Sequence, residues 1–142
     1  MTEPAVPPLT GPVPRVDHVT LTVSDLAAST EWYQRLLGPA QLFPVSGDGW
    51  TRTVLIWPGQ LMIGLSEYRH RPPGAGGAFD HTRIGLDHLG LHCASESEVH
   101  AWAARMDALG VVRGPVEASP YGWAVTSRDP DGIPVEFFCV LP

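Results

Sequence analysis

Apolar and polar side chains alternate over residues 16–23, which is the pattern of a β-strand with one buried face. A helix is predicted from about residue 25 to 37, because a capping residue precedes it and Gly38 follows it. Strand-like runs bounded by turn-forming residues follow at about 40–45, 51–57 and 60–67. The first half of the chain therefore predicts the order βαβββ.

The second half has the same pattern. Residues 86–93 alternate again, and a helix is predicted from about 96 to 109, with Gly110 at its end. Strands are predicted after it at about 111–117, 122–127 and 133–140. The order βαβββ thus occurs twice.

The two copies keep a nearly constant spacing. His18 and His88 are 70 residues apart (88 − 18), and Gly38 and Gly110 are 72 residues apart (110 − 38). A two-residue difference in the loop between the first strand and the helix reconciles the two offsets. Such a repeat indicates a duplicated module. We therefore expect an α+β fold of two βαβββ modules in tandem, whose curved mixed sheets surround a shared concave site.

The chain has 142 residues, which is the length of one domain. We expect that domain at 15–142, with module 1 at about 15–67, a Gly- and Pro-rich linker at about 68–83, and module 2 at about 84–140. Residues 1–14 contain five prolines and are predicted to be a disordered tail, because proline cannot donate a backbone hydrogen bond.

The net charge of −6 argues against nucleic acid or an anionic membrane as a partner. No apolar run is long enough to span a bilayer, and residues 1–14 lack the features of a signal peptide, so a cytoplasmic location is expected. Cys93 and Cys139 lie in apolar strand-like segments and are expected to be buried free thiols. A disulfide between them, or a pair of Cys93 with His92, is the alternative.

Three residues with metal-binding side chains stand at suggestive places. His18 and His88 occupy the same position in the two first strands, and Glu136 lies in the apolar last strand, where a carboxylate is costly unless it is paired or bound to a cation. Two imidazoles and one carboxylate on one face suit a divalent ion (Fe, Mn, Zn, Ni or Co) and leave positions open for a substrate. The alternatives are histidines satisfied within the core, and Glu136 paired with an arginine such as Arg52 or Arg83.

Four segments of the chain form a recognisable set: 16–19 (VDHV), 32–38 (WYQRLLG), 86–89 (LDHL) and 129–138 (DPDGIPVEFF). In these segments the chain resembles the vicinal oxygen chelate superfamily, which includes glyoxalase I, extradiol dioxygenases, fosfomycin-resistance enzymes, methylmalonyl-CoA epimerase and bleomycin-binding proteins. The resemblance covers about residues 15–140. It is specific for the fold and weak for the reaction, because members keep these motifs across unrelated chemistries.

The resemblance implies metal ligands at the histidine of each first strand and at a glutamate of each last strand. His18, His88 and Glu136 match these positions, but the fourth falls on Gly64 (136 − 72). Glu67 lies three residues further on, where a regular strand turns it to the opposite face and only a bulge would bring it back. Glycine at position 64 weakens a glyoxalase I-like reading, and the remaining triad resembles that of extradiol dioxygenases and fosfomycin transferases.

Aromatic and basic side chains in the two third-strand regions indicate a ligand surface. Trp50 and Arg52 lie in module 1, and Tyr121 and Trp123 lie in module 2. Aromatic side chains there suit stacking against a flat apolar ligand, and Arg52 suits an anionic substrate group. The alternatives are core packing for the aromatic residues and a surface role for Arg52.

Together these features predict a metal-dependent enzyme (a lyase, an isomerase or a dioxygenase-like enzyme) acting on a small oxygen-bearing organic substrate. His18, His88 and Glu136 hold the ion, and Glu136 is the catalytic side chain. The resemblance implies a homodimer, in which His18 of one chain meets the other two ligands from its partner. The alternative is a metal-free binding protein of the bleomycin-resistance type, which sequesters an aromatic or antibiotic-like ligand. Gly64 fits that alternative.

Overall fold

Within residues 5–141, which the computed structural model describes, helices and strands follow one order that occurs twice. The elements are β1 (Val19–Thr22), α1 (Leu26–Leu37), β2 (Gln41–Gly47), β3 (Trp50–Ile56), β4 (Met62–Tyr68), β5 (Leu89–His92), α2 (Glu96–Leu109), β6 (Glu117–Ser119), β7 (Gly122–Arg128) and β8 (Pro134–Val140). The strands form two four-stranded mixed sheets, ordered β1-β4-β3-β2 and β5-β8-β7-β6. The predicted α+β fold of two tandem βαβββ modules is confirmed.

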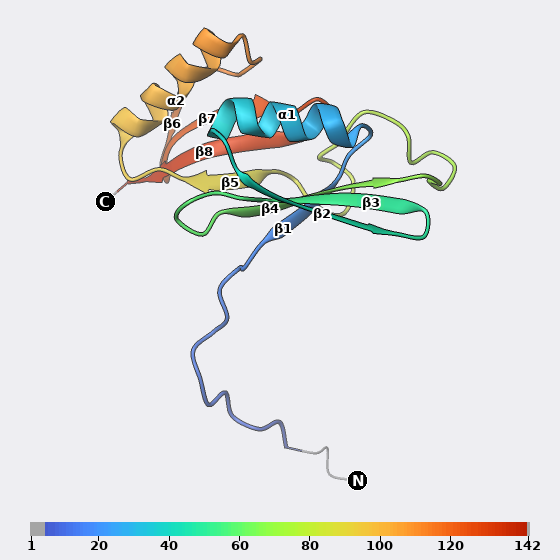
Figure 1. The fold of residues 1–142 in the computed structure, drawn as a ribbon. Coiled ribbons are helices and arrows are strands. Elements are labelled where there is room, and N and C mark those ends of the chain that lie inside the picture. The colour runs from blue at the N-terminus through green and yellow to red at the C-terminus, as the bar shows by residue number, and fades with distance from the viewer. Residues whose placement is uncertain (1–4, 142) are drawn as a thin grey trace.

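Both helices lie on the same side of the two sheets (Figure 1). α1 packs against β3 and β4, α2 packs against β7 and β8, and the helices contact each other. The opposite side of the sheets carries no helix within the described residues, and we call it the open face. Side chains alternate between the two sides. Leu55 and Ile63 are buried beneath α1, whereas Val54 and Gly64, which pair in neighbouring strands, belong to the open face.

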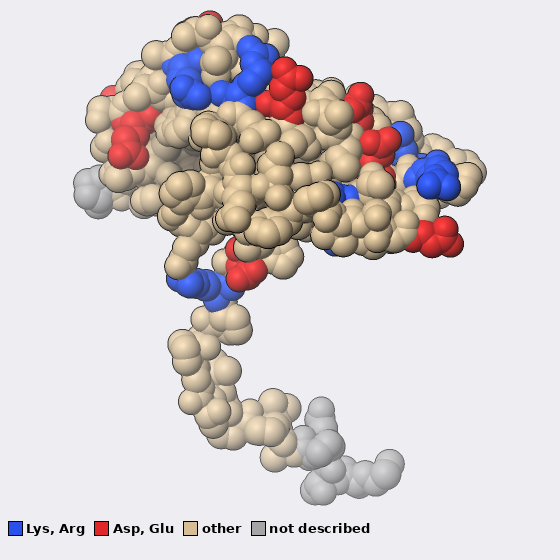
Figure 2. All heavy atoms as spheres, viewed as in Figure 1, with Lys and Arg blue, Asp and Glu red and all other residues tan. Residues whose placement is uncertain are grey.

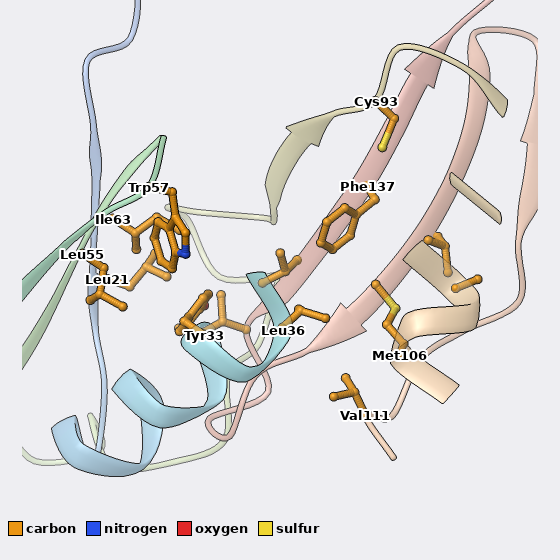
Figure 3. Packing of buried hydrophobic residues seen from close by; sticks show 14 of the residues in the cluster. Leu21, Tyr33, Leu36, Leu55, Trp57, Ile63, Cys93, Met106, Val111 and Phe137 are labelled. Atoms are coloured by element: carbon orange, nitrogen blue, oxygen red, sulfur yellow. The ribbon is translucent and has the colours of Figure 1, made fainter. Parts of the chain in front are cut away.

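One hydrophobic cluster joins the two modules (Figure 3). Tyr33 and Leu36 of α1 and Met106 of α2 are fully buried in it, together with Phe137 of β8. The ring of Trp102 stacks on Phe137 with ring centroids 4.4 Å apart. Because large side chains from both modules bury one another, the two open faces are held in a fixed relation.

Local sequence explains where the helices begin and end. The carboxylate of Asp25 accepts a hydrogen bond from the backbone N–H of Ala28 (2.9 Å), and Ser95 caps α2 in the same way through Glu98 (3.3 Å). α1 ends at Leu37 and is followed by Gly38, whose φ of 94° favours glycine. Both helices match their predicted ranges to within one residue.

The first strand of each module is shorter than the sequence predicts. β1 begins at Val19, which pairs with Ile63, the second residue of its parallel partner β4, so pairing does not extend back to His18. β5 is shortened in the same way and begins at Leu89. The placement of His18 and His88 in mid-strand is therefore wrong, since each lies one residue before its strand.

The strand predicted at 111–117 is also wrong. That segment contributes only an isolated bridge between Arg113 and Ser127, and the edge strand β6 begins at Glu117. Gly114 still donates its backbone N–H to Thr126 in β7 (2.9 Å), but pairing stops at Pro115, because proline has no N–H to donate.

The turn between β7 and β8 ties module 2 to module 1. The hydroxyl of Tyr33 in α1 donates a 3.0 Å hydrogen bond to the buried carboxylate of Asp129. The backbone N–H of Ser24, in the loop before α1, donates to Asp131 (2.9 Å). These bonds fix the first strand–helix loop of one module against the last turn of the other.

Residues 5–18 form neither helix nor strand and lead away from the sheets (Figure 1). The first four residues of the predicted tail lie outside the described part. Between β4 and β5, the chain also lacks regular structure over 69–88. The division into tail, modules and linker stays a prediction.

Cys93 and Cys139 are both buried free cysteines, as expected. No helix among residues 5–141 is long and apolar enough to cross a membrane. On the face shown in Figure 2, basic side chains lie in separate groups rather than in one continuous patch.

Candidate metal centre on the open face

His88 and Glu136 come together on the open face of the second sheet. Glu136 of β8 pairs with Gly90 of β5, and His88 stands two residues before Gly90, so both side chains project from the same side. His88 Nε2 lies 3.6 Å from Glu136 Oε1, with side-chain exposures of 43% and 25%. An imidazole nitrogen and a carboxylate oxygen, both partly accessible, are thus adjacent and suit a divalent cation.

Each candidate histidine is held by the aspartate before it. Nδ1 of His88 lies 2.7 Å from Asp87 Oδ1, and Nδ1 of His18 lies 2.7 Å from Asp17 Oδ1. The hydrogen bond to His88 lowers the pKa of the Asp87 carboxyl below its ordinary value. An ionised carboxylate only accepts, so Nδ1 donates to it, and Nε2 is the ring nitrogen that remains for a metal.

The sequence argument missed these two aspartates. The signal was present, because the dipeptide Asp-His occurs at the same place in both copies, as Asp17-His18 and Asp87-His88. Such a carboxylate partner is typical of histidines that bind metals, since it fixes the tautomer and the orientation of the ring.

His18 does not join the pair formed by His88 and Glu136. Within residues 5–141, no three His, Cys, Asp or Glu side chains gather closely enough to hold one metal ion. His18 instead precedes β1 of the other sheet. One chain therefore brings together two members of the predicted triad, and the third lies in the other module.

The first sheet has a different pair where the second has Gly90 and Glu136. Thr20 of β1 pairs with Gly64 of β4, so Thr20 corresponds to Gly90 and Gly64 to Glu136. A Cβ atom added to Gly64 would lie 2.7 Å from Thr20 Oγ1 and 3.3 Å from Thr20 Cβ. The Thr20 side chain therefore covers the place from which a carboxylate at position 64 would project.

Glu67 does not replace that missing carboxylate in this chain. β4 pairs with β3 without a bulge, so Glu67 points to the helix side, opposite to Gly64. Its Oε2 atom accepts a 2.8 Å hydrogen bond from the backbone N–H of Leu26, the first residue of α1. A carboxylate at a helix N-terminus is stabilised by the free N–H groups there.

Trp50 and Arg52 lie side by side on the open face of the first sheet. The Arg52 guanidinium carbon is 4.9 Å from the centroid of the Trp50 ring, and Arg52 Nε donates a 2.7 Å hydrogen bond to Ser66 Oγ. The alternative pairing of Glu136 with Arg52 or Arg83 is absent among the described residues, where Arg83 instead faces Asp80.

The two aromatic residues expected at the ligand surface of module 2 lie elsewhere. Trp123 pairs with the buried Cys139, so it faces the helix side, where its ring lies 5.8 Å from that of His100 in α2. Tyr121 is exposed at the tip of the β6–β7 turn. Neither residue lies beside His88.

Comparison with known proteins identifies the family. The model of the glyoxalase/bleomycin resistance protein/dioxygenase superfamily matches residues 15–137. The chain belongs to this superfamily. Its structure resembles a glyoxylase/bleomycin resistance protein/dioxygenase domain from Frankia sp. EAN1pec, with 33% identity, a TM-score of 0.80, and coverage of 92% of this chain and 100% of that chain.

More distant members of the superfamily share the fold. Lactoylglutathione lyase from Agrobacterium tumefaciens has 21% identity and a TM-score of 0.69, and covers 91% of this chain and 96% of its own. The fosfomycin resistance protein FosX from Listeria monocytogenes, solved with Mn(II) and sulfate, has 20% identity and a TM-score of 0.64, covering 91% and 94%. No curated protein matches the chain significantly.

Proposed function

We propose that this superfamily member is a divalent-metal enzyme acting on a small oxygen-bearing organic substrate, with each metal site shared between two chains of a homodimer. His88 and Glu136 of one chain supply two ligands, and His18 of its partner supplies the third. The observation that carries the proposal is the 3.6 Å approach of His88 to Glu136, together with the 2.7 Å contacts that leave Nε2 of both histidines free.

The residues fit a cation of the type that FosX was solved with, Mn(II), and also Fe(II), Zn(II), Ni(II) or Co(II). Such an ion acts as a Lewis acid that polarises a bound oxygen atom and stabilises a developing negative charge. Asp17 and Asp87 contact Nδ1 of the two imidazole rings, which orients the rings and leaves Nε2 as the nitrogen that would bind the ion. Glu136 neutralises part of the positive charge and, beside the bound substrate, is placed to take up a proton.

The separation of the ligands supports a dimer. Among the described residues, His18 does not gather with His88 and Glu136, whereas a two-fold axis would bring module 1 of one chain to module 2 of its partner twice. The open faces suit such contact, because they expose apolar side chains such as Phe43, Val45 and Val140.

The test uses two variants that each remove one side of the shared site. One chain carries His18→Ala, and the other carries His88→Ala with Glu136→Gln. Each chain has its own affinity tag, so that the mixed dimer is purified through both tags and its metal content is measured after dialysis against Mn(II), Zn(II) or Fe(II). Each variant alone should lose the ion, and the mixed dimer should regain about half of the wild-type content, because one of its two sites is intact.

The possible results separate the parts of the proposal. A mixed dimer that binds no more metal than its parents would exclude a shared site. Full metal content in His18→Ala alone would place the ion within one chain, and a wild-type protein that binds none of these ions would exclude the metal enzyme altogether.

A second candidate function is metal-free binding of an aromatic ligand. The observation that favours it is the Thr20–Gly64 pair, which leaves module 1 without an open-face carboxylate beside a half-buried tryptophan and arginine. Ligand binding that is unchanged by a chelator and by Glu136→Gln, without turnover, would favour this candidate over the enzyme.

A further inference from the structure

We infer that Arg52 is the anchor for an anionic group of the ligand, so the substrate class is a small organic acid, carrying a carboxylate or a phosphonate, with a flat apolar part. The inference deepens the proposed function by naming the substrate class, and it rests on that function only for the chemistry that follows binding. Three features of the open face of the first sheet support it. They are the contacts that hold the guanidinium, the absence of a counter-ion among the described residues, and the position of Arg52 on the sheet.

The guanidinium of Arg52 is fixed in advance of any ligand. Its Nε atom donates to the hydroxyl of Ser66, a residue that is 1% exposed, and its plane lies over the ring of Trp50. That ring in turn lies on Gly47, where a Cβ atom would come within 2.4 Å of it. Little side-chain freedom is therefore left to lose when an anion binds.

The charge of Arg52 has no counter-ion among the described residues. Arg113 forms a 2.8 Å ion pair with Asp107, and Arg83 lies 3.9 Å from Asp80, but Arg52 contacts only a neutral hydroxyl and an indole ring. The Nη1 and Nη2 groups of Arg52, which make no hydrogen bond in this part of the chain, match the two oxygens of a carboxylate or a phosphonate.

No other charge competes with Arg52 on its own sheet. By strand alternation and register, the open-face positions of β1 to β4 other than position 52 hold only neutral residues. They are Thr20, Thr22, Gln41, Phe43, Val45, Gly47, Trp50, Val54, Ile56, Met62, Gly64, Ser66 and Tyr68. A lone half-buried cation on a largely apolar, aromatic surface selects a ligand that is itself flat, apolar and singly anionic at one end.

The position of Arg52 sets the size of the ligand. Arg52 pairs with Ser66, which is two residues beyond Gly64 on β4, and Gly64 pairs with Thr20 of β1. The candidate ligand His18 precedes Thr20 by two more residues, so its row lies about 13 Å along the strands from the row of Arg52. An acid held by Arg52 thus extends its other oxygen atoms toward His18 over the length of a small molecule.

The test uses the full chain freed of metal by a chelator, with benzoate and phenylphosphonate as probes and benzamide as the neutral control. The readout is the indole N–H signal of Trp50 in a ¹H–¹⁵N spectrum, assigned by its loss in Trp50→Phe. Both anions, or one of them, should shift this signal saturably, whereas benzamide should not. The anion that binds more tightly identifies the group as carboxylate or phosphonate.

Variants assign the effect to one side chain. Arg52→Gln should weaken binding by about tenfold or more, Arg52→Lys should weaken it less, and Arg128→Gln, which removes an exposed arginine of module 2, should leave it unchanged. Unchanged binding in a folded Arg52→Gln protein, an equal response to benzamide, or no saturable shift with either anion would overturn the inference. Because no metal is present, a failure here is distinct from a failure of the shared metal site.

Discussion

Replacing Gly64 by alanine tests why module 1 carries no carboxylate at the position of Glu136. The added Cβ atom would lie 2.7 Å from Thr20 Oγ1, 3.1 Å from Cγ2 and 3.3 Å from Cβ. Rotation of the threonine side chain can relieve the first two contacts but not the third, so the strands must also shift. Overpacking of this kind costs about 1–3 kcal/mol of unfolding free energy.

Thr20→Ala is the compensating variant in module 1, and Gly90→Ala at the matching position of module 2 is the control. Thr20→Ala removes Oγ1 and Cγ2, so the double variant Thr20→Ala/Gly64→Ala should recover most of the loss, with a coupling energy of about 1 kcal/mol or more. Gly90→Ala in module 2 meets no atom within 4 Å and should be neutral or slightly stabilising, because alanine restricts the unfolded chain.

Urea unfolding measures the wild type and the four variants Gly64→Ala, Thr20→Ala, the double variant and Gly90→Ala. With a slope of about 1–3 kcal/mol per molar urea, Gly64→Ala should move the midpoint down by about 1 M, and Gly90→Ala should not lower it. A Gly64→Ala protein as stable as wild type, or a double variant no more stable than the single one, would refute the contact between Thr20 and position 64.

Two further predictions concern the hydrogen bond between Tyr33 of module 1 and Asp129 of module 2. Tyr33→Phe should destabilise the fold by about 1.5–3 kcal/mol in urea unfolding, because the buried Asp129 carboxylate loses its hydroxyl donor; an unchanged midpoint would contradict this. Burial raises the pKa of Asp129, so its contribution to stability is complete below the ordinary aspartate pKa and is lost as the pH rises through the raised value. Asp129→Asn, which stays neutral, should therefore gain stability relative to wild type as the pH rises above about 4, the ordinary aspartate pKa, and parallel curves for the two proteins would exclude the effect.

Much of the fold could be predicted from the sequence, because the signals for its elements are local and occur twice. The capping residue before the first helix and the stops at Gly38 and Gly110 predicted the helices to within one residue. The first residues of β1 and β5 could not be predicted, because they depend on pairing with a parallel strand that is distant in the sequence. Alternation along a strand predicts which face a residue takes, but it says nothing of how far pairing extends.

The candidate site, too, could be predicted from the sequence only in part. The repeat singled out His18, His88 and Glu136, but one offset applied to every strand would also have excluded Trp123. Adding 72 to Trp50 gives position 122, and Trp123 accordingly faces the helices. The split of the triad between two sheets is beyond any spacing argument, because it depends on how the modules pack.

The two modules differ at one pair of neighbouring open-face residues, which is Gly90 and Glu136 in module 2 but Thr20 and Gly64 in module 1. The glycine lies on the first strand of module 2 and on the last strand of module 1, and this difference suits the modules for separate tasks. In module 2, Gly90 leaves room over β5, so Glu136 can reach His88. In module 1, Thr20 fills that room, and the next row holds Arg52 instead. A duplicated fold that kept a carboxylate in both rows would attract a cation to each and repel an organic acid from both. With one carboxylate and one unpaired arginine, a two-fold dimer would place a metal-binding half opposite an acid-binding half in each of two identical sites.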